Sequence, residues 1–239
     1  MIDKWDVLII TGRPAAGKSE LIDYLRNCPE QERLSKFRTG RFEEIDDFRY
    51  VWETFETDDI LQMHGKPRLL TTPDYFFKDP FIWTLFIERI NLEYRKKLAR
   101  EPRYFDDRTL LVEFARGGEH GLRDAFAHLE PTLLKRACML YIKVSYEESV
   151  RRNHLRFRPG QADSILYHSL PDEKMELYYK STDWMQLAPH SEGKMIAQGI
   201  EVPYVVLDNE HGTTDDPKML GPALFQTCER LWKVKTNAR

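Results

Sequence analysis

The sequence predicts one α/β domain in which a parallel β-sheet lies between two layers of helices. Five short runs, mostly apolar, have the length of buried strands and alternate with longer segments of helical periodicity. These strands are expected at 7–11, 41–45, 109–114, 139–144 and 202–207. A glycine-containing loop follows the first strand and leads directly into a helix. Strands that alternate with helices favour a parallel sheet covered on both faces.

The composition supports a single domain with a sizeable core. The chain has 239 residues, of which 41% are hydrophobic and 31% are charged. A net charge of −3 argues against a surface built for nucleic acid. No apolar run has transmembrane length and residues 1–6 do not resemble a signal peptide, so we predict no membrane partner and a cytoplasmic location. Three widely spaced cysteines indicate neither a disulfide framework nor a zinc site.

The loop after the first strand carries the strongest chemical signal in the chain. It matches the pattern G-x-x-x-x-G-K-S/T completely, with Gly12, Arg13, Pro14, Ala15, Ala16, Gly17, Lys18 and Ser19. Glycines allow such a loop to wrap a phosphate chain, and the N–H groups at the helix start point at the phosphate oxygens. Lys18 can reach the β- and γ-phosphates, and the Ser19 hydroxyl can bind Mg²⁺. We predict that the chain binds a nucleoside triphosphate, ATP, with Mg²⁺.

Two adjacent carboxylates, Asp46 and Asp47, follow the second strand. Beside a phosphate loop, one of them can approach Mg²⁺ or its waters while the other accepts a proton from an attacking hydroxyl. Either residue can be the general base, and Asp46 is also a candidate metal ligand. The alternative is an exposed acidic turn without function.

Glu113 ends the third strand, and Arg116 follows it in a glycine-rich turn. Ligands in open parallel sheets bind beyond the carboxyl ends of the strands, where both residues are expected. A carboxylate that ends an apolar strand needs a partner. Mg²⁺ or an acceptor hydroxyl could be that partner for Glu113, and a salt bridge between Glu113 and Arg116 is the alternative.

A helix after the fourth strand is rich in arginine. Ser145 and Glu148 have the spacing of a capping box that begins it. The arginines are Arg151, Arg152, Arg156 and Arg158. Such a row could close over triphosphate oxygens and stabilise the transferred charge, with Arg152 and Arg156 as catalytic candidates. The alternative is a solvated basic helix, which we consider less favoured because no acidic partners at helical spacing neutralise these arginines.

The remaining helices are read from caps and apolar stripes. Asp79-Pro80 is expected to begin a core helix, with Asp79 as its cap, and Asp216-Pro217 to begin the last helix. Further helices are expected at about 122–136 and 172–187, and residues 52–78 are expected to form loops and a short helix. No further strand is predicted.

Taken together, these motifs resemble those of the P-loop kinase group, most closely its uridine kinase and nicotinamide riboside kinase branch. The resemblance rests on the loop 12–19, the Asp46-Asp47-Phe48 segment, Glu113 and the arginine helix. It implies a P-loop NTPase fold whose five parallel strands have the order 2-3-1-4-5. It also implies that the Asp-Asp-Phe segment supplies the general base, that the strand-end Glu113 holds Mg²⁺ or the acceptor, and that lid arginines close on ATP. The single domain, 1–239, would carry an acceptor-side insertion at about 49–80 and a lid region at about 145–200.

The resulting hypothesis is a Mg²⁺-dependent kinase that transfers the γ-phosphate of ATP to a hydroxyl of a small metabolite, such as a nucleoside-like compound. One alternative is an NTPase or a nucleotide-gated binding protein. The nearest variant is a kinase of a phosphorylated acceptor, such as a nucleoside monophosphate, whose phosphate Arg116, Arg49 or Arg68 could hold. The expected partner is the small-molecule acceptor, and a homodimer is left open.

Overall fold

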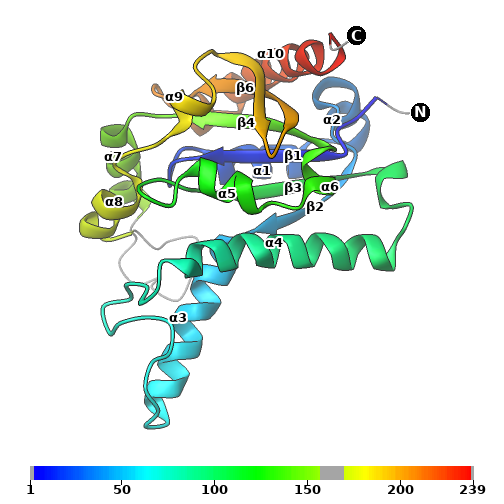
Figure 1. The fold of residues 1–239 in the computed structure, drawn as a ribbon. Helices are drawn as coiled ribbons and strands as arrows, with labels where there is room; N and C mark the ends of the chain where they lie inside the picture. Colours follow the sequence, from blue (N-terminus) through cyan, green and yellow to red (C-terminus); the bar gives the residue numbers. More distant parts are fainter. Residues whose placement is uncertain (1–2, 157–169, 238–239) are drawn as a thin grey trace.

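The computed structural model describes residues 3–156 and 170–237 and consists of a β-sheet between two layers of helices (Figure 1). The strands are β1 (Val7–Gly12), β2 (Arg41–Asp46), β3 (Arg108–Phe114), β4 (Ala137–Lys143), β5 (Glu192–Ala197) and β6 (Ile200–Asp208). The helices are α1 (Lys18–Asn27), α2 (Glu30–Phe37), α3 (Phe48–Met63), α4 (Phe81–Arg100), α5 (Leu122–His128), α6 (Pro131–Leu134), α7 (Tyr146–Arg156), α8 (Asp172–Tyr179), α9 (Trp184–Leu187) and α10 (Pro217–Thr236).

The predicted parallel sheet is confirmed, and its edge carries one more strand than predicted. The order is β2-β3-β1-β4-β6-β5, so the five parallel strands follow the expected order. β5 pairs with β6 in the antiparallel direction. The two are joined through Gln198 and Gly199, whose φ angles of 52° and 75° form a tight hairpin turn. β5 escaped prediction because it is a half-exposed edge strand whose first half is Glu192-Gly193-Lys194 and whose apolar run is only three residues long.

β1 divides the interior into two cores, because its successive side chains point to opposite faces of the sheet. Val7 and Ile9 pack in one core, mainly against α4, α5 and α6. Leu8 and Ile10 pack in the other, against α1, α2 and α10. Each fully buried side chain of this size contributes about 1.5–3 kcal/mol. The central strand is therefore held from both sides, and the loop that follows it has a rigid base.

Two predicted helices are each two helices in the structure. The segment expected at 122–136 breaks before Pro131, which has no N–H to continue α5 and instead begins α6. The segment expected at 172–187 breaks between α8 and α9, where Asp183 accepts hydrogen bonds from the N–H groups of Leu122 and Arg123. Asp183, which directly precedes α9, is thus tied by a tertiary contact to the start of α5.

The segment expected to form an acceptor-side insertion contains a long helix where loops and a short helix were predicted. α3 has 16 residues and projects away from the sheet (Figure 1). The chain turns back at its end because Asp58, which is fully buried, accepts hydrogen bonds from the N–H groups of residues 69–71. Sequence periodicity missed α3 because aromatic and charged side chains are mixed around it.

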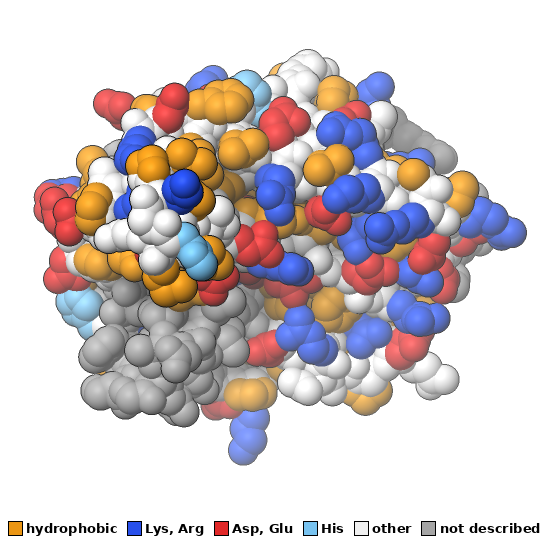
Figure 2. Space-filling model, turned by 90° about the horizontal axis from the view of Figure 1, so that it is seen from below, with side chains coloured by type: hydrophobic (Ala, Val, Ile, Leu, Met, Phe, Trp, Pro, Cys, Tyr) orange, Lys and Arg blue, Asp and Glu red, His pale blue; other side chains and the backbone are white. Residues whose placement is uncertain are grey.

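The predicted start at Asp216-Pro217 is confirmed, whereas α4 begins one residue later than predicted, at Phe81 with Pro80 as its N-cap. The Asp79 carboxylate accepts a hydrogen bond from Phe81 N at 2.8 Å, and Asp216 accepts one from Lys218 N at 2.9 Å. None of the helices in the described part of the chain is long and apolar enough to cross a membrane. On the face that α3 and α4 share, described positive and negative side chains are interspersed and form no patch of one sign (Figure 2).

Candidate active site

The phosphate loop lies between the end of β1 and the start of α1, as predicted. Ala15 and Gly17 have φ angles of 54° and 106°. A side chain cannot be accommodated at Gly17, since a Cβ atom would lie 2.3 Å from Thr214 Oγ1 and 2.6 Å from Asn209 Nδ2. The N–H groups at the start of α1 carry the positive end of the helix dipole, so this loop is suited to bind phosphate.

Two buried side chains that the sequence did not single out hold this loop from outside. Asn209 Nδ2 donates to Ala16 O at 2.7 Å, and Ser149 Oγ donates to Pro14 O at 2.7 Å. Both residues are fully buried. Asn209 directly follows β6, so the carboxyl end of that strand was the available signal. Together these bonds fix the positions of two carbonyl groups of the loop.

Lys18, in contrast, bridges the loop and the sheet. Its Nζ atom donates to Arg13 O at 3.0 Å and lies 3.7 Å from Glu113 Oε1. The side chain is largely buried, with 7% relative exposure for the residue. Ser19 follows it, half-buried, in the first turn of α1. Lys18 therefore links the candidate phosphate site to the carboxylates at the end of β3.

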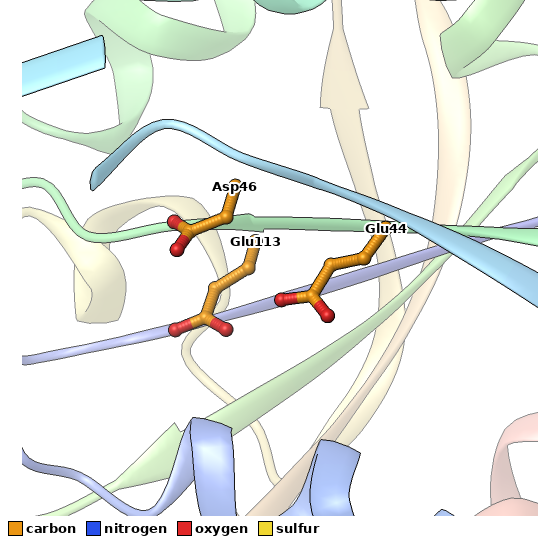
Figure 3. Close-up of side chains that lie close together, drawn as sticks. All are labelled: Glu44, Asp46 and Glu113. Carbon is orange, nitrogen blue, oxygen red and sulfur yellow. The ribbon is translucent and has the colours of Figure 1, made fainter. Parts of the chain in front are cut away.

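Three carboxylates meet beside Lys18. Asp46 of β2 and Glu113 of β3 are register partners in the parallel ladder, and Glu44 precedes Asp46 by two residues. Side chains at these positions share one face of the sheet, and Figure 3 shows all three projecting to the same side. Ligand oxygens of the three residues lie within 4.8 Å of one another. Glu44 was missed in the sequence, where the alternation Glu44-x-Asp46 was the signal for a shared face.

The electrostatics of this cluster favour the uptake of positive charge. Burial, followed by the nearby Asp47 carboxylate, raises the pKa of Asp46 to about 7. Burial raises the pKa of Glu113 to about 8, although the Lys18 ammonium opposes the shift. Burial also raises the pKa of Glu44, against the effect of Arg26. A divalent cation would relieve this repulsion, and carboxylate and hydroxyl oxygens are ligands that Mg²⁺ prefers. The residues therefore fit a Mg²⁺ site.

We expect the free energy of unfolding of the metal-free protein to fall as the pH rises from about 5 to about 8. Asp46 and Glu113 have folded-state pKa values of about 7 and about 8, above the ordinary 3.8 and 4.5. The folded state thus holds more protons, and this stabilisation, complete below about pH 4, is lost as the pH passes through about 7 to 8. Thermal unfolding with a chelator at several pH values measures the loss. Asp46→Asn and Glu113→Gln should each make the fall of the unfolding free energy with pH shallower. Equal slopes for the wild type and both variants would contradict these pKa shifts.

Asp47 faces a different environment from Asp46. It forms a buried ion pair with Arg116, and both residues are at most 5% exposed. The Arg116 guanidinium also lies 5.1 Å from the Trp83 ring centroid and donates to Ala115 O at 2.7 Å. Burial raises the pKa of Asp47, and Arg116 opposes the shift.

Two alternatives from the sequence are therefore wrong. Glu113 and Arg116 do not form a salt bridge with each other, because Glu113 pairs with Lys18 and Arg116 pairs with Asp47. The Asp46-Asp47 pair is not an exposed acidic turn, because Asp47 is buried and Asp46 is half-buried.

The arginines of α7 have acidic partners, contrary to the premise drawn from the sequence. Arg152 pairs with Glu148 at 2.6 Å and with Asp215 at 2.8 Å, and it is 7% exposed. Hydrogen bonding from Arg151, then from Arg152, lowers the pKa of Glu148 to about 2. Glu148 therefore does not complete the predicted capping box. Its N–H donates to Ser145 Oγ, but the carboxylate that accepts from Ser145 N belongs to Glu210.

Arg156 contacts the first turn of α1, which follows the phosphate loop. Its Nη2 atom donates to the two carboxylate oxygens of Glu20 at 3.0 and 3.3 Å, and Glu20 directly follows Ser19. Arg158, the last arginine of the predicted row, lies outside the described residues, and so do residues 157–169 of the predicted lid region. α7 ends at Arg156.

No protein-family model matches the chain, and no curated protein matches it. Among solved structures, it is similar to a gluconokinase from Sinorhizobium meliloti 1021, at 14% identity and a TM-score of 0.44, over 97% of each chain. It is also similar to a shikimate kinase from Acinetobacter baumannii in complex with shikimate, at 12% identity and a TM-score of 0.42, over 100% of this chain and 97% of that chain. A sugar kinase from Janibacter sp. HTCC2649 is 12% identical, with a TM-score of 0.40, over 95% of each chain. The resemblance to the uridine kinase and nicotinamide riboside kinase branch is not confirmed by these matches.

Proposed function

We propose that the protein is a phosphotransferase that moves the γ-phosphate of ATP to a hydroxyl of a small metabolite. The observation that carries this proposal is the position of Asp46, a carboxylate at the end of β2 in the cluster that adjoins Lys18 of the phosphate loop. In the absence of a metal ion, burial raises the pKa of this carboxylate to about 7, and a general base works best when its pKa is near the working pH. In this role Asp46 accepts the proton that leaves the acceptor hydroxyl as the new P–O bond forms.

Asp46 is preferred to Asp47 as the base for an electrostatic reason. Asp47 is paired with Arg116 in a buried environment, and this guanidinium favours its ionised form and reduces its basicity. Asp46 forms no salt bridge with any of the described residues. Its carboxylate accepts a hydrogen bond from Phe48 N at 2.9 Å. We therefore assign the role of proton acceptor to Asp46. Asp47 and Arg116 instead hold the end of β2 against the turn that follows β3.

Ser19, Glu44 and Glu113 are the proposed Mg²⁺ ligands, and Asp46 adjoins them. When bound, Mg²⁺ neutralises charge on the phosphate oxygens. Lys18 contributes in the same direction from the protein side. Gly12, Ala16 and Gly17 belong to the loop whose main chain would surround the phosphates, and its helix-start N–H groups supply the remaining hydrogen bonds.

An acceptor without a phosphate group is favoured over a nucleoside monophosphate. The three arginines that could hold an acceptor phosphate each have an acidic partner. Arg116 pairs with Asp47, Arg49 with Glu53, and Arg68 with Asp59. A phosphate would have to displace these carboxylates. A neutral hydroxyl compound requires no such exchange.

The test is transfer of label from γ-labelled ATP to a panel of sugars, nucleosides, vitamins and nucleoside monophosphates. Labelling of a neutral hydroxyl compound, with little ATP hydrolysis when no acceptor is present, is the expected result. Rapid hydrolysis without an acceptor, and no labelled panel member, would favour the NTPase alternative. Labelling confined to monophosphates would instead favour the variant with a phosphorylated acceptor.

Arg156 and Arg152 should respond differently to substitution by alanine. Arg156 is half-exposed and its ion pair with Glu20 contributes little stability, so Arg156→Ala should shift the thermal midpoint by less than about 2 °C. If Arg156 contacts phosphate, its loss should lower turnover about 10- to 100-fold, the value of a charged hydrogen bond. Arg152→Ala should instead cost about 2 kcal/mol of stability, because Glu148 and Asp215 lose their charged hydrogen bonds to a buried guanidinium.

Turnover and thermal unfolding of both variants, measured together, make this comparison. A loss of turnover below about threefold in Arg156→Ala would assign this end of α7 to the solvated surface. For Arg152→Ala we expect a loss of turnover below about threefold together with lower stability, because Arg152 holds α7 against the loop after β6.

A further inference from the structure

We propose that Arg13 is a positioning residue that fixes α8 against the phosphate loop, and that α8 in turn fixes the acceptor side of the site. The inference rests on the proposed function, but its contacts are independent of the nature of the acceptor. Arg13 occupies the first variable position of the phosphate loop, which the G-x-x-x-x-G-K-S/T pattern leaves unspecified.

Among the described residues, the hydrogen bonds of the Arg13 guanidinium all go to main-chain carbonyls. Its Nε atom donates to Tyr179 O at 3.2 Å, and its Nη2 atom donates to Lys180 O at 3.2 Å. Its Nη1 atom donates to Val144 O, at the end of β4, at 3.1 Å. No acidic side chain within the described ranges, 3–156 and 170–237, forms a salt bridge with it. The last carbonyls of a helix have no partner within the helix and carry the negative end of its dipole, so a guanidinium is suited to them.

The same end of α8 also holds the turn that follows β3. Gly118 N donates to Ser181 O at 3.1 Å. A Cβ atom at Gly117 would lie 2.7 Å from the carbonyl oxygens of both Tyr178 and Ser181, so only glycine allows this approach. This turn begins with Arg116, the partner of Asp47. The C-terminal end of α8 therefore contacts both Arg13 and the turn that follows β3.

Side chains of α8 contact the aromatic residues of the acceptor-side insertion. Lys174 Nζ lies 5.0 Å from the ring centroid of Phe76 and 5.7 Å from that of Phe55. The Tyr178 ring lies 5.1 Å from the ring of Trp83, which also faces Arg116. Cation–π and edge-to-face contacts of this kind depend on orientation, so they favour one position of α8 against these aromatic residues. α8 thus touches the phosphate loop, the β3 turn and the insertion at once.

Direct contact between Arg13 and a phosphate is the competing role for this residue. The guanidinium has five N–H donors in a fixed fork, and its Nε, Nη1 and Nη2 atoms all donate to carbonyls of the protein. A swing to the ligand would leave the carbonyls at the end of α8 without these bonds. We therefore expect Arg13 to act on the acceptor side through α8, with little effect on the binding of ATP itself.

The experiment compares the wild type with Arg13→Ala and Arg13→Lys, and uses Arg103→Ala as the control. The Arg103 side chain is 90% exposed, and its partner is the exposed Asp106. Amide hydrogen exchange is followed in the peptide that covers 172–181, and Mg²⁺-ATP affinity is measured by calorimetry without an acceptor. Neither readout requires the acceptor to be known.

In Arg13→Ala, exchange of the 172–181 amides should rise by about tenfold or more, with a smaller rise in Arg13→Lys and none in Arg103→Ala. The dissociation constant of Mg²⁺-ATP should change by less than about threefold. Once an acceptor is found, its KM should rise more than that of ATP. Should the alanine variant fail to fold, Arg13→Lys carries the same comparison, since one ammonium cannot satisfy all three carbonyls.

Unchanged exchange in 172–181 would overturn the proposal. A loss of ATP affinity of about tenfold without a change in exchange would show that Arg13 binds phosphate directly. Both outcomes differ from a failure of the proposed function, because a protein that binds ATP but phosphorylates no acceptor would still show the exchange effect.

Discussion

Replacing Lys18 by alanine should lower the rate of ATP use by about 10³-fold and leave the fold intact. Lys18 is the cation that the phosphate loop offers to the β- and γ-phosphates, and removal of such a preorganised charge costs about 10²–10³-fold in rate. The substitution also removes the partner of Glu113. Glu113 already has a pKa of about 8 and would take up a proton in response, so an unpaired buried charge does not persist near neutral pH.

The measurement combines calorimetry with Mg²⁺-ATP, turnover and thermal unfolding. Lys36→Ala is the matched control, because Lys36 is an exposed lysine whose partner is Glu32 on the same helix. It should leave all three quantities unchanged. Wild-type affinity and activity in Lys18→Ala would remove the central claim that this loop binds the triphosphate.

Asp46→Asn should lower phosphotransfer by about 10²-fold or more while Mg²⁺-ATP still binds. The amide keeps the shape of the side chain but cannot accept the proton of the acceptor hydroxyl. Asp47→Asn should behave differently, because it leaves the Arg116 charge buried without its counter-charge. Loss of one partner of a buried ion pair costs about 3–5 kcal/mol, so this variant should lose stability first and activity as a consequence.

The Mg²⁺ dependence separates a base from a metal ligand within one cluster. Glu113→Gln and Glu44→Gln should raise the Mg²⁺ concentration that is needed for half-maximal activity, whereas Asp46→Asn should lower the maximal rate at saturating Mg²⁺. If Asp46→Asn only shifts the Mg²⁺ requirement, Asp46 is a ligand and the base must be sought elsewhere. If ATP hydrolysis is fast without an acceptor and insensitive to both Asp→Asn changes, the kinase proposal fails.

Local chemistry made one part of the site predictable from the sequence. A phosphate loop is continuous in the chain, and its glycines, lysine and serine act through main-chain geometry that is fixed over eight residues. The parallel strands were also predictable, since burial on both faces produces uninterrupted apolar runs such as Val7–Ile10. The cap at Asp216 follows the same logic, because a cap and its helix are neighbours in sequence.

Sequence alone therefore determined the phosphate loop, the five parallel strands and some of the polar residues at the ends of these strands, namely Asp46, Asp47 and Glu113. Only the tertiary structure decided how those residues pair. Asp46 and Asp47 are adjacent in sequence, but they face opposite environments, one beside Glu44 and Glu113 and the other against Arg116. Arg152 reaches Asp215 across 63 positions of the chain. Which charged groups pair depends on their distance and burial in the folded protein. Spacing along the chain predicts that distance only within a single helix or strand.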